Sequence, residues 1–305
     1  MALDETGLLC HGSARGGKVK SAPTIARLLA ERVPLVLPGV WDALSARLAA
    51  RAGARAVFIS GYALSATRLA EGDIGLVTAT EVLDAAARIC EAVDVPVVVD
   101  IDTGYGTERS VERTVQRLLR IGAAGCFLED QVWPKRCGHL AGKQVVPLED
   151  YLPKLQAALA TRGGAPFHVT ARTDARAALG VDEALRRAQA FAAAGADAVF
   201  VEAPESADEM ARVRAAVPER VPLVANMVEG GKTPLRSAAE LAAAGHPIVV
   251  APLTGLLASA RALERAYAAL VRDGASRAVA DDLLGFGAMN TILGVGHLSP
   301  PDRSS

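Results

Sequence analysis

The sequence predicts a (β/α)8 barrel. Eight short apolar runs recur along the 305 residues, and most are followed by a polar turn and an Ala-, Leu- and Arg-rich stretch of helical character. Several runs are unbroken series of β-branched residues without alternation, which is typical of strands covered on both faces. Eight strand–helix units in about 230 residues favour a closed barrel over an open doubly wound sheet, which is the alternative.

The first four predicted strands are VPLVLPG (33–39), AVFIS (56–60), VPVVVDID (95–102) and GCFLED (125–130). Helical stretches separate them: ALSARLAARAG, ATEVLDAAARICEAV and SVERTVQRLLRIGA. Endings in Gly or Ala-Gly indicate helix C-termini. The glycine pair in DTGYGTERS gives the open-sheet alternative little support, because the third glycine of a dinucleotide-binding loop is missing.

The last four predicted strands are FHVTART (167–173), AVFVEA (198–203), PLVAN (222–226) and IVVAPL (248–253). EALRRAQAFAAAGA and SAAELAAAG provide helices between them. We expect a catalytic barrel domain over residues 21–275, preceded by a flexible segment at 1–20. A helical extension and tail at 276–305 lie beyond the eighth unit, where we expect contact with a neighbouring subunit.

Composition excludes several classes of function. Lys plus Arg total 33 against 34 Asp plus Glu, and aromatic residues make up 4%. Nucleic acid binding is therefore not expected, since it needs a basic face or stacking platforms. The sequence has no apolar run of membrane-spanning length and no signal-peptide core, and its four cysteines share no CxxC spacing, so we expect a cytoplasmic protein with free thiols.

Polar residues follow nearly every predicted strand. Barrel enzymes build their sites at the C-terminal ends of the strands, so these residues are expected to meet on one face. The candidates are Ser60, Gly61, Tyr62, Asp100, Asp102, Glu129, Asp130, Arg172, Glu202, Asn226 and Thr254.

Asp100 and Asp102 are two residues apart on a chain expected to be extended, so both side chains are expected to point the same way. Together with Glu129 they would repel one another unless a cation joined them or one took a proton. Oxygen ligands without a His or Cys cluster favour Mg²⁺, or Mn²⁺, over Zn²⁺. The alternative is that one Asp caps a turn and the other is solvated.

Arg172 and Asn226 suit a carboxylate-bearing ligand, because a guanidinium pairs with both carboxylate oxygens and an amide donates a hydrogen bond. The turn at residues 60–62 could present backbone N–H groups to an anion, although a structural role is as plausible from the sequence. These groups predict a small substrate with two or more carboxylates.

Cys137 lies among Lys135, Arg136 and His139, which would lower the pKa of its thiol. Such a cysteine can act as a nucleophile or as a general acid or base. The polar segment 131–142 follows the fourth strand and is expected to close over the site. The alternative is a surface loop with an incidental cysteine.

These motifs resemble the isocitrate lyase/phosphoenolpyruvate mutase superfamily, in the branch that carries a catalytic thiol. The resemblance covers about residues 33–270. The matching segments are PKRCGH (134–139), VVVDIDTGYG (97–106), LEDQ (128–131), WDALSARL (41–48), ARTDA (171–175), VEA (201–203) and NMVEGGKTP (226–234).

The resemblance implies a barrel whose terminal helix is exchanged between the subunits of a homotetramer or dimer, with Mg²⁺ at the strand ends. Asp100 and Asp102 would hold the metal, with Glu129 reached through water. Cys137 would lie on the mobile loop, with the catalytic Lys135 and His139 beside it, and Arg172 would line the pocket as a further catalytic residue. The residues expected to bind substrate are Trp41, Ser60, Gly61, Tyr62, Asp73, Gly138, Glu202, Asn226 and Thr254.

The resemblance also implies cleavage of a 2-hydroxy di- or tricarboxylate, of the methylisocitrate or 2-alkylmalate type, to a 2-keto acid and a second carboxylate. Cys137 would protonate the carbanion as a general acid. The alternative is a carboxyphosphoenolpyruvate phosphonomutase, which forms a phosphorus–carbon bond with nearly the same residues. LAGK at 140–143 and NMVEGGKTP resemble dimethylmalate lyase and this mutase more than the methylisocitrate enzymes. A non-enzymatic barrel would leave the strand-end acids, Arg172 and Cys137 without a role together.

Overall fold

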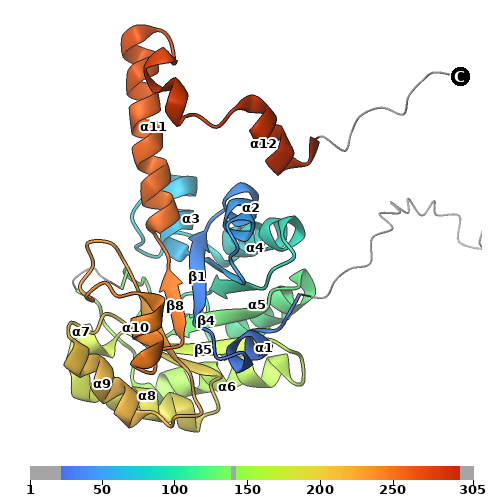
Figure 1. Ribbon diagram of the computed structural model, residues 1–305. Helices are drawn as coiled ribbons and strands as arrows, with labels where there is room; N and C mark the ends of the chain where they lie inside the picture. Colours follow the sequence, from blue (N-terminus) through green and yellow to red (C-terminus); the bar gives the residue numbers. More distant parts are fainter. Residues whose placement is uncertain (1–21, 139–141, 296–305) are drawn as a thin grey trace, which may run out of the picture.

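A computed structural model describes residues 22–138 and 142–295 and confirms the predicted barrel (Figure 1). Eight parallel strands pair in chain order, and β1 pairs with β8 from Leu35↔Ile248 to Pro38↔Ala251, which closes the ring. The strands are β1 Leu35–Val40, β2 Val57–Ile59, β3 Val97–Asp100, β4 Gly125–Glu129, β5 His168–Thr173, β6 Ala198–Val201, β7 Leu223–Asn226 and β8 Ile248–Ala251. Each lies within one of the eight runs identified from sequence, apart from one added residue, Val40.

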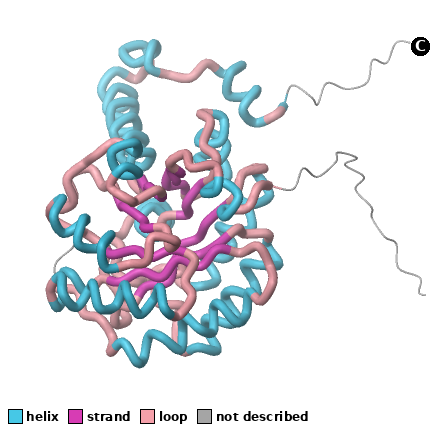
Figure 2. The backbone as a smooth tube through the Cα atoms, turned by 60° about the horizontal axis from the view of Figure 1, so that its bottom comes forward, coloured by secondary structure: helices cyan, strands magenta, loops and turns pink. Residues whose placement is uncertain are grey.

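Helices surround the strands (Figure 2). Several begin with a side chain that accepts a backbone N–H bond, as Asp42 does for α2 and Thr78 for α4. The helices are α1 Ile25–Ala30, α2 Ala43–Arg51, α3 Gly61–Leu69, α4 Ala79–Ala92, α5 Glu108–Ile121, α6 Leu148–Arg162, α7 Ala175–Leu179, α8 Val181–Ala193, α9 Ala207–Ala216, α10 Ala238–Ala243, α11 Thr254–Asp273 and α12 Phe286–Leu293, with a 3₁₀ turn η1 at Arg277–Asp282. None of the helices in the described residues is long and apolar enough to cross a membrane.

The buried side chains form two layers. One contains strand residues such as Leu37, Phe58 and Phe127 with Ile25 and Leu28 of α1, so it fills the inside of the ring. The other joins the outer strand faces to the surrounding helices. Alternation along each strand sends one set of side chains inward and the other outward. The filled interior leaves the strand ends as the place for a site.

The eighth strand–helix unit differs from the others, because α11 extends away from the barrel (Figure 1). Val36 of β1 is therefore 39% exposed, although the outward-facing residues of β2 to β7 are buried. Beyond α11, η1 and α12 lie in the stretch where the sequence predicts extra helices. The predicted flexible segment at 1–20 lies outside the described residues.

We expect the contribution of His246 to native stability to fall as the pH drops from about 6.5 to about 4, because the ring is buried without its charge. Burial, with a smaller contribution from Arg214, lowers the pKa of His246 to about 4. In that window the unfolded chain binds a proton that the native state does not, so native stability is complete above pH 6.5 and decreases below it. At pH 5.5 the cost is about 1 kcal/mol. Urea unfolding at pH 7.5 and 5.5 checks this: His246→Gln is expected to show the smaller loss, and an equal loss in both proteins would contradict it.

Candidate active site

The strand ends enclose a small cavity of about 40 Å³. Side chains from several strands and from the segment after β4 line it, as the sequence predicts. The polar or reactive residues of the lining are Ser60, Tyr62, Asp73, Asp100, Cys137, Gly138, Arg172 and Asn226, and the apolar ones are Phe58, Phe127, Phe200, Val228, Val250, Pro252 and Leu253. Asp102, Glu129, Lys135 and Glu202 lie buried beside this lining.

Asp100 and Asp102 come together, but for a different reason from the one predicted. The strand ends at Asp100, and Asp102 has a φ of +48°, so the extended backbone expected at Asp102 is wrong. A turn instead lets the N–H of Asp102 donate to Oδ1 of Asp100 at 3.1 Å. Gly61 permits the close approach, since a Cβ there would lie 3.3 Å from Asp100 Oδ2 and 3.5 Å from Asp102 Oδ1.

Lys135 joins these acids to Asp73. Its Nζ lies 2.6 Å from Asp73 Oδ1 and 2.8 Å from Asp102 Oδ1, and the side chain is almost completely buried. Burial by itself would lower the pKa of Lys135, but the surrounding carboxylates, Asp102 and Asp73 foremost, raise it well above its ordinary value. Lys135 is thus a permanent cation of the acid cluster, in addition to its predicted place beside the thiol.

Arg172 is surrounded by three carboxylates. Its Nε lies 2.8 Å from Asp174 Oδ2 and 3.2 Å from Glu129 Oε2, and its Nη2 lies 3.6 Å from Glu202 Oε2. The guanidinium carbon also lies 5.2 Å from the centre of the Phe200 ring. Asn226 donates to both oxygens of Glu202, at 3.2 and 3.3 Å. These contacts fix the guanidinium at the cavity wall, where it can meet a substrate carboxylate.

The donor set fits a divalent cation. Burial raises the pKa of Asp102 to about 7, with Asp100 and Asp73 adding to it and Lys135 opposing it. Burial likewise raises the pKa of Asp100. A bound cation would stabilise both carboxylates in their charged form. In the described part of the chain no three His, Cys, Asp or Glu side chains form a ready-made metal cage. Two carboxylates with waters are a usual arrangement for Mg²⁺.

The turn at residues 60–62 is the start of α3. Ser60 is its N-cap, with Oγ accepting from the N–H of Ala63 at 3.2 Å. Ser60 and Tyr62 line the cavity, so the first N–H groups of this helix are close to it. Helix N-termini bind anions through such groups. The geometry therefore accommodates the anion-binding interpretation of this turn.

Cys137 and Gly138 lie against the strand-end acids. The N–H of Cys137 donates to the carbonyl of Asp73 at 2.9 Å. A Cβ on Gly138 would lie 2.5 Å from Cδ of Glu202 and 2.8 Å from Nη2 of Arg172. The segment thus packs directly on two pocket residues. His139 lies outside the described residues.

Gln131 is a site residue that the sequence analysis did not single out. Its amide donates to Glu129 Oε1 at 3.0 Å and to the carbonyl of Arg136 at 2.8 Å, and its Oε1 accepts from the N–H of Arg136 at 3.1 Å. Gln131 therefore attaches the loop that carries Cys137 to the end of β4. The one signal for it is its place directly after Glu129 and Asp130.

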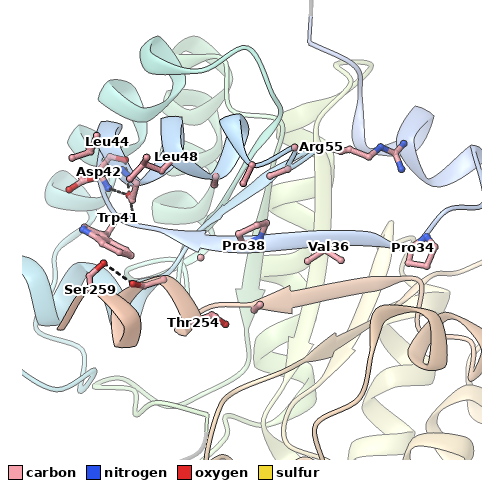
Figure 3. Close-up of a pocket in the computed structure, with 18 residues that line it drawn as sticks. Pro34, Val36, Pro38, Trp41, Asp42, Leu44, Leu48, Arg55, Thr254 and Ser259 are labelled. Carbon is pink, nitrogen blue, oxygen red and sulfur yellow. Dashed lines mark hydrogen bonds between the residues drawn. The ribbon is translucent and has the colours of Figure 1, made fainter. Parts of the chain in front are cut away.

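Trp41 and Thr254 are not brought to this cavity. They line a separate groove of about 690 Å³ between β1, α2 and the start of α11 (Figure 3). Thr254 donates to Glu229 Oε1 at 2.5 Å. The Trp41 ring lies against the first turn of α11, 3.5 Å from the position of a Cβ on Gly255. Their strand-end positions do not bring them to the centre because α11 diverges from the barrel there.

Comparison with known proteins identifies related enzymes. Residues 25–271 match the family model described as phosphoenolpyruvate phosphomutase. The chain is 40% identical to 2,3-dimethylmalate lyase of Eubacterium barkeri, over 91% of this chain and 95% of that protein. It is 42% identical to the chloroplastic carboxyvinyl-carboxyphosphonate phosphorylmutase of Arabidopsis thaliana (88% and 79%). It is 43% identical to 2-methylisocitrate lyase of Halalkalibacterium halodurans (86% and 86%).

Solved structures agree with these relatives. An oxaloacetate acetylhydrolase with bound 3,3-difluorooxalacetate superposes with a TM-score of 0.85 at 33% identity, covering 92% of this chain and 95% of that one. A phosphonopyruvate hydrolase with bound oxalate and Mg²⁺ superposes with a TM-score of 0.79 at 30% identity (88% and 93%).

We expect Gly138→Ala to expose Cys137. The added methyl group would overlap Glu202 and Arg172, and overpacking of this kind costs about 1–3 kcal/mol, so the segment should leave its position part of the time. Alkylation of Cys137 by iodoacetamide, followed by peptide mass spectrometry, is expected to become about tenfold faster. Gly164→Ala is the control, since nothing lies within 4 Å of a Cβ there. Equal rates in the wild type and Gly138→Ala would contradict the packing.

Proposed function

The chain belongs to the phosphoenolpyruvate phosphomutase family, and we propose that it is a Mg²⁺-dependent carbon–carbon lyase, with Mn²⁺ as a possible substitute. Its substrate is a 2-hydroxy di- or tricarboxylate of the 2-alkylmalate or methylisocitrate type, and its products are a 2-keto acid such as pyruvate and a carboxylate such as succinate. The observation that carries the proposal is one buried cavity lined by a thiol, a guanidinium and a carboxylate, Cys137, Arg172 and Asp100.

The residues divide the work of such a cleavage. Asp100 and Asp102, with Glu129 nearby, would hold the cation, which when bound would polarise the 2-oxygen and its neighbouring carboxylate. Arg172 and the N-terminus of α3 bind the carboxylates. A base takes the hydroxyl proton and passes it to solvent, the C2–C3 bond breaks with its electron pair on C3, and the 2-oxygen becomes the carbonyl of the keto acid.

Cys137 completes the reaction by donating the thiol proton to C3, so the carbanion becomes a C–H group and the second product leaves as a carboxylate. Arg172 and Lys135 place positive charge near the enolate-like intermediate. The thiolate that remains takes up a proton before the next turnover. Gly138 and Asp73 hold the cysteine at the cavity wall during this step.

The lining supports the alkylmalate type in particular. In the described residues, the β7–β8 side of the cavity consists of Asn226, Val228, Val250, Pro252 and Leu253, without a cation. The charged group bonded to this side is another carboxylate, Glu202, which accepts from Asn226. An alkyl substituent gains from this apolar wall, whereas a third carboxylate would be desolvated without a partner.

The second candidate is a carboxyphosphoenolpyruvate-type phosphonomutase. The observation in its favour is the 42% identity to the Arabidopsis phosphorylmutase. Formation of a phosphorus–carbon bond by the purified protein would favour it, and pyruvate release from alkylmalates would favour the lyase.

We expect the purified protein with Mg²⁺ to release keto acid from one member of a panel of 2-hydroxy di- and tricarboxylates, measured by coupling to a dehydrogenase. EDTA is expected to abolish the release. Cys137→Ser is expected to lower kcat by about 10²- to 10⁴-fold, because a hydroxyl is a far weaker acid. Cys90→Ser is the matched control, since Cys90 lies on α4 and burial raises the pKa of its thiol to about 11. Full cleavage by Cys137→Ser would show that the thiol is not the acid.

We also propose that the chain forms a homotetramer, or a dimer, in which the helical extension of another copy covers the groove between β1, α2 and α11. The groove has an apolar lining that includes Val36 and Leu48, and exposed apolar side chains lie on α11 (Tyr267 and Val271) and on α12 of the extension (Phe286). Apolar surface on both parts supports their pairing.

Leu48→Lys is expected to shift the protein to smaller species, because it places a charge in the groove. Analytical ultracentrifugation checks this, with four chains of 31.5 kDa giving about 126 kDa for the tetramer. Leu179→Lys is the matched control, because Leu179 is exposed on α7, away from the groove. A monomeric wild type would refute the proposal.

A further inference from the structure

Lys143 is the last residue of LAGK, and the function proposed above gives it no task. Its side chain is almost completely buried, and Nζ donates to the carbonyl of Gly138 at 2.5 Å and to Asp174 Oδ1 at 2.6 Å. We infer that Lys143 is a positioning residue that holds the thiol of Cys137 in register with the guanidinium of Arg172. This inference rests on the proposed function for its catalytic meaning.

One contact of Lys143 acts on the thiol. The carbonyl of Gly138 directly follows Cys137, and the N–H of Cys137 is bonded to the carbonyl of Asp73. The cysteine is thus fixed on both sides, by Asp73 before its side chain and by Lys143 after it. An ammonium donating to a carbonyl in a buried place is a strong hydrogen bond, since a charged donor is involved.

The other contact acts on Arg172. Asp174 Oδ1 accepts from Lys143 and from Nη2 of Arg172 (3.1 Å), while Asp174 Oδ2 accepts from Nε of Arg172 (2.8 Å). Burial would raise the pKa of Asp174, but Arg172 and Lys143 hold it at about 2. Asp174 is therefore a carboxylate that ties both cations together.

Asp174 is itself held by Asp130, which is in turn bonded to α8. Its N–H donates to Asp130 Oδ1 at 2.9 Å, and Asp130 Oδ2 accepts from Thr173 and from Arg187 of α8. The ammonium group of Lys143 thus makes one hydrogen bond to the fixed Asp174 carboxylate and one to the backbone beside the thiol. A change at Lys143 should therefore move Cys137 relative to the substrate, although Lys143 itself does not contact the substrate.

Lys143→Met tests this in the full chain with Mg²⁺, because methionine keeps the stem but loses the ammonium. We expect kcat to fall at least tenfold with KM changed less than threefold, and iodoacetamide to alkylate Cys137 about tenfold faster, as for loss of one charged hydrogen bond. Arg88→Met is the control, since Arg88 is an exposed cation that pairs with Asp84 on α4, away from the loop after β4.

A second variant separates positioning from stability. Lys143→Met leaves Asp174 with one cation fewer, which lowers thermal stability. Lys143→Met/Asp174→Asn removes that excess charge, and we expect it to regain thermal stability while the thiol remains rapidly alkylated. Restoration of the wild-type alkylation rate in the double variant would overturn the inference.

The outcomes distinguish the inference from the proposed function. If the wild type cleaves none of the panel while Lys143→Met still accelerates alkylation of Cys137, the positioning stands and the lyase proposal fails. If the wild type is active and Lys143→Met matches it in kcat and alkylation rate, the inference is overturned. Loss of activity only in proportion to the unfolded fraction, with unchanged alkylation of the folded protein, overturns it as well.

Discussion

The pairing of β1 with β8 is the constraint on which the rest of the structure depends. It closes eight parallel strands into a ring, so residues far apart in sequence end at one face. Asp100, Glu129, Arg172 and Asn226 come from four strands and meet there because each is the last or next-to-last residue of its strand. Without closure, the first and last strands would lie at opposite edges of a sheet.

Closure also brings several buried carboxylates together at the strand ends, and a few cations pair with them. Lys135 forms ion pairs with Asp73 and Asp102. Arg172 forms them with Glu129, Asp174 and Glu202, and Lys143 also pairs with Asp174. The described carboxylates therefore outnumber the cations that meet them, and this excess agrees with a place for a divalent metal. A buried ionic network tolerates few substitutions, since removal of one partner leaves another charge without compensation.

Much of this could be predicted from the sequence, because strands covered on both faces are recognisable by composition and barrel sites lie at strand ends. The prediction of paired side chains assumed a strand that continues to Asp102, but β3 ends two residues earlier, at Asp100, and a turn produces the pairing instead. Trp41 was assigned from the family resemblance and Thr254 from its place at the end of the eighth strand, but both line another groove because α11 departs from the barrel there. Gln131 was missed because its role is to join the Glu129 side chain to the backbone of Arg136, which no local pattern reveals.

The sequence by itself determined the eight strands, the face on which the polar residues gather, and the family of enzymes to which the chain belongs. Those properties follow from local composition and from motifs a few residues long. Only the tertiary structure decided which cation serves which acid, that Gly138 packs on Glu202 and Arg172, and that Lys143 connects the loop to Asp174. Such contacts join residues from different strand–helix units. Which residues become partners depends on positions in space that residue spacing along the sequence does not contain.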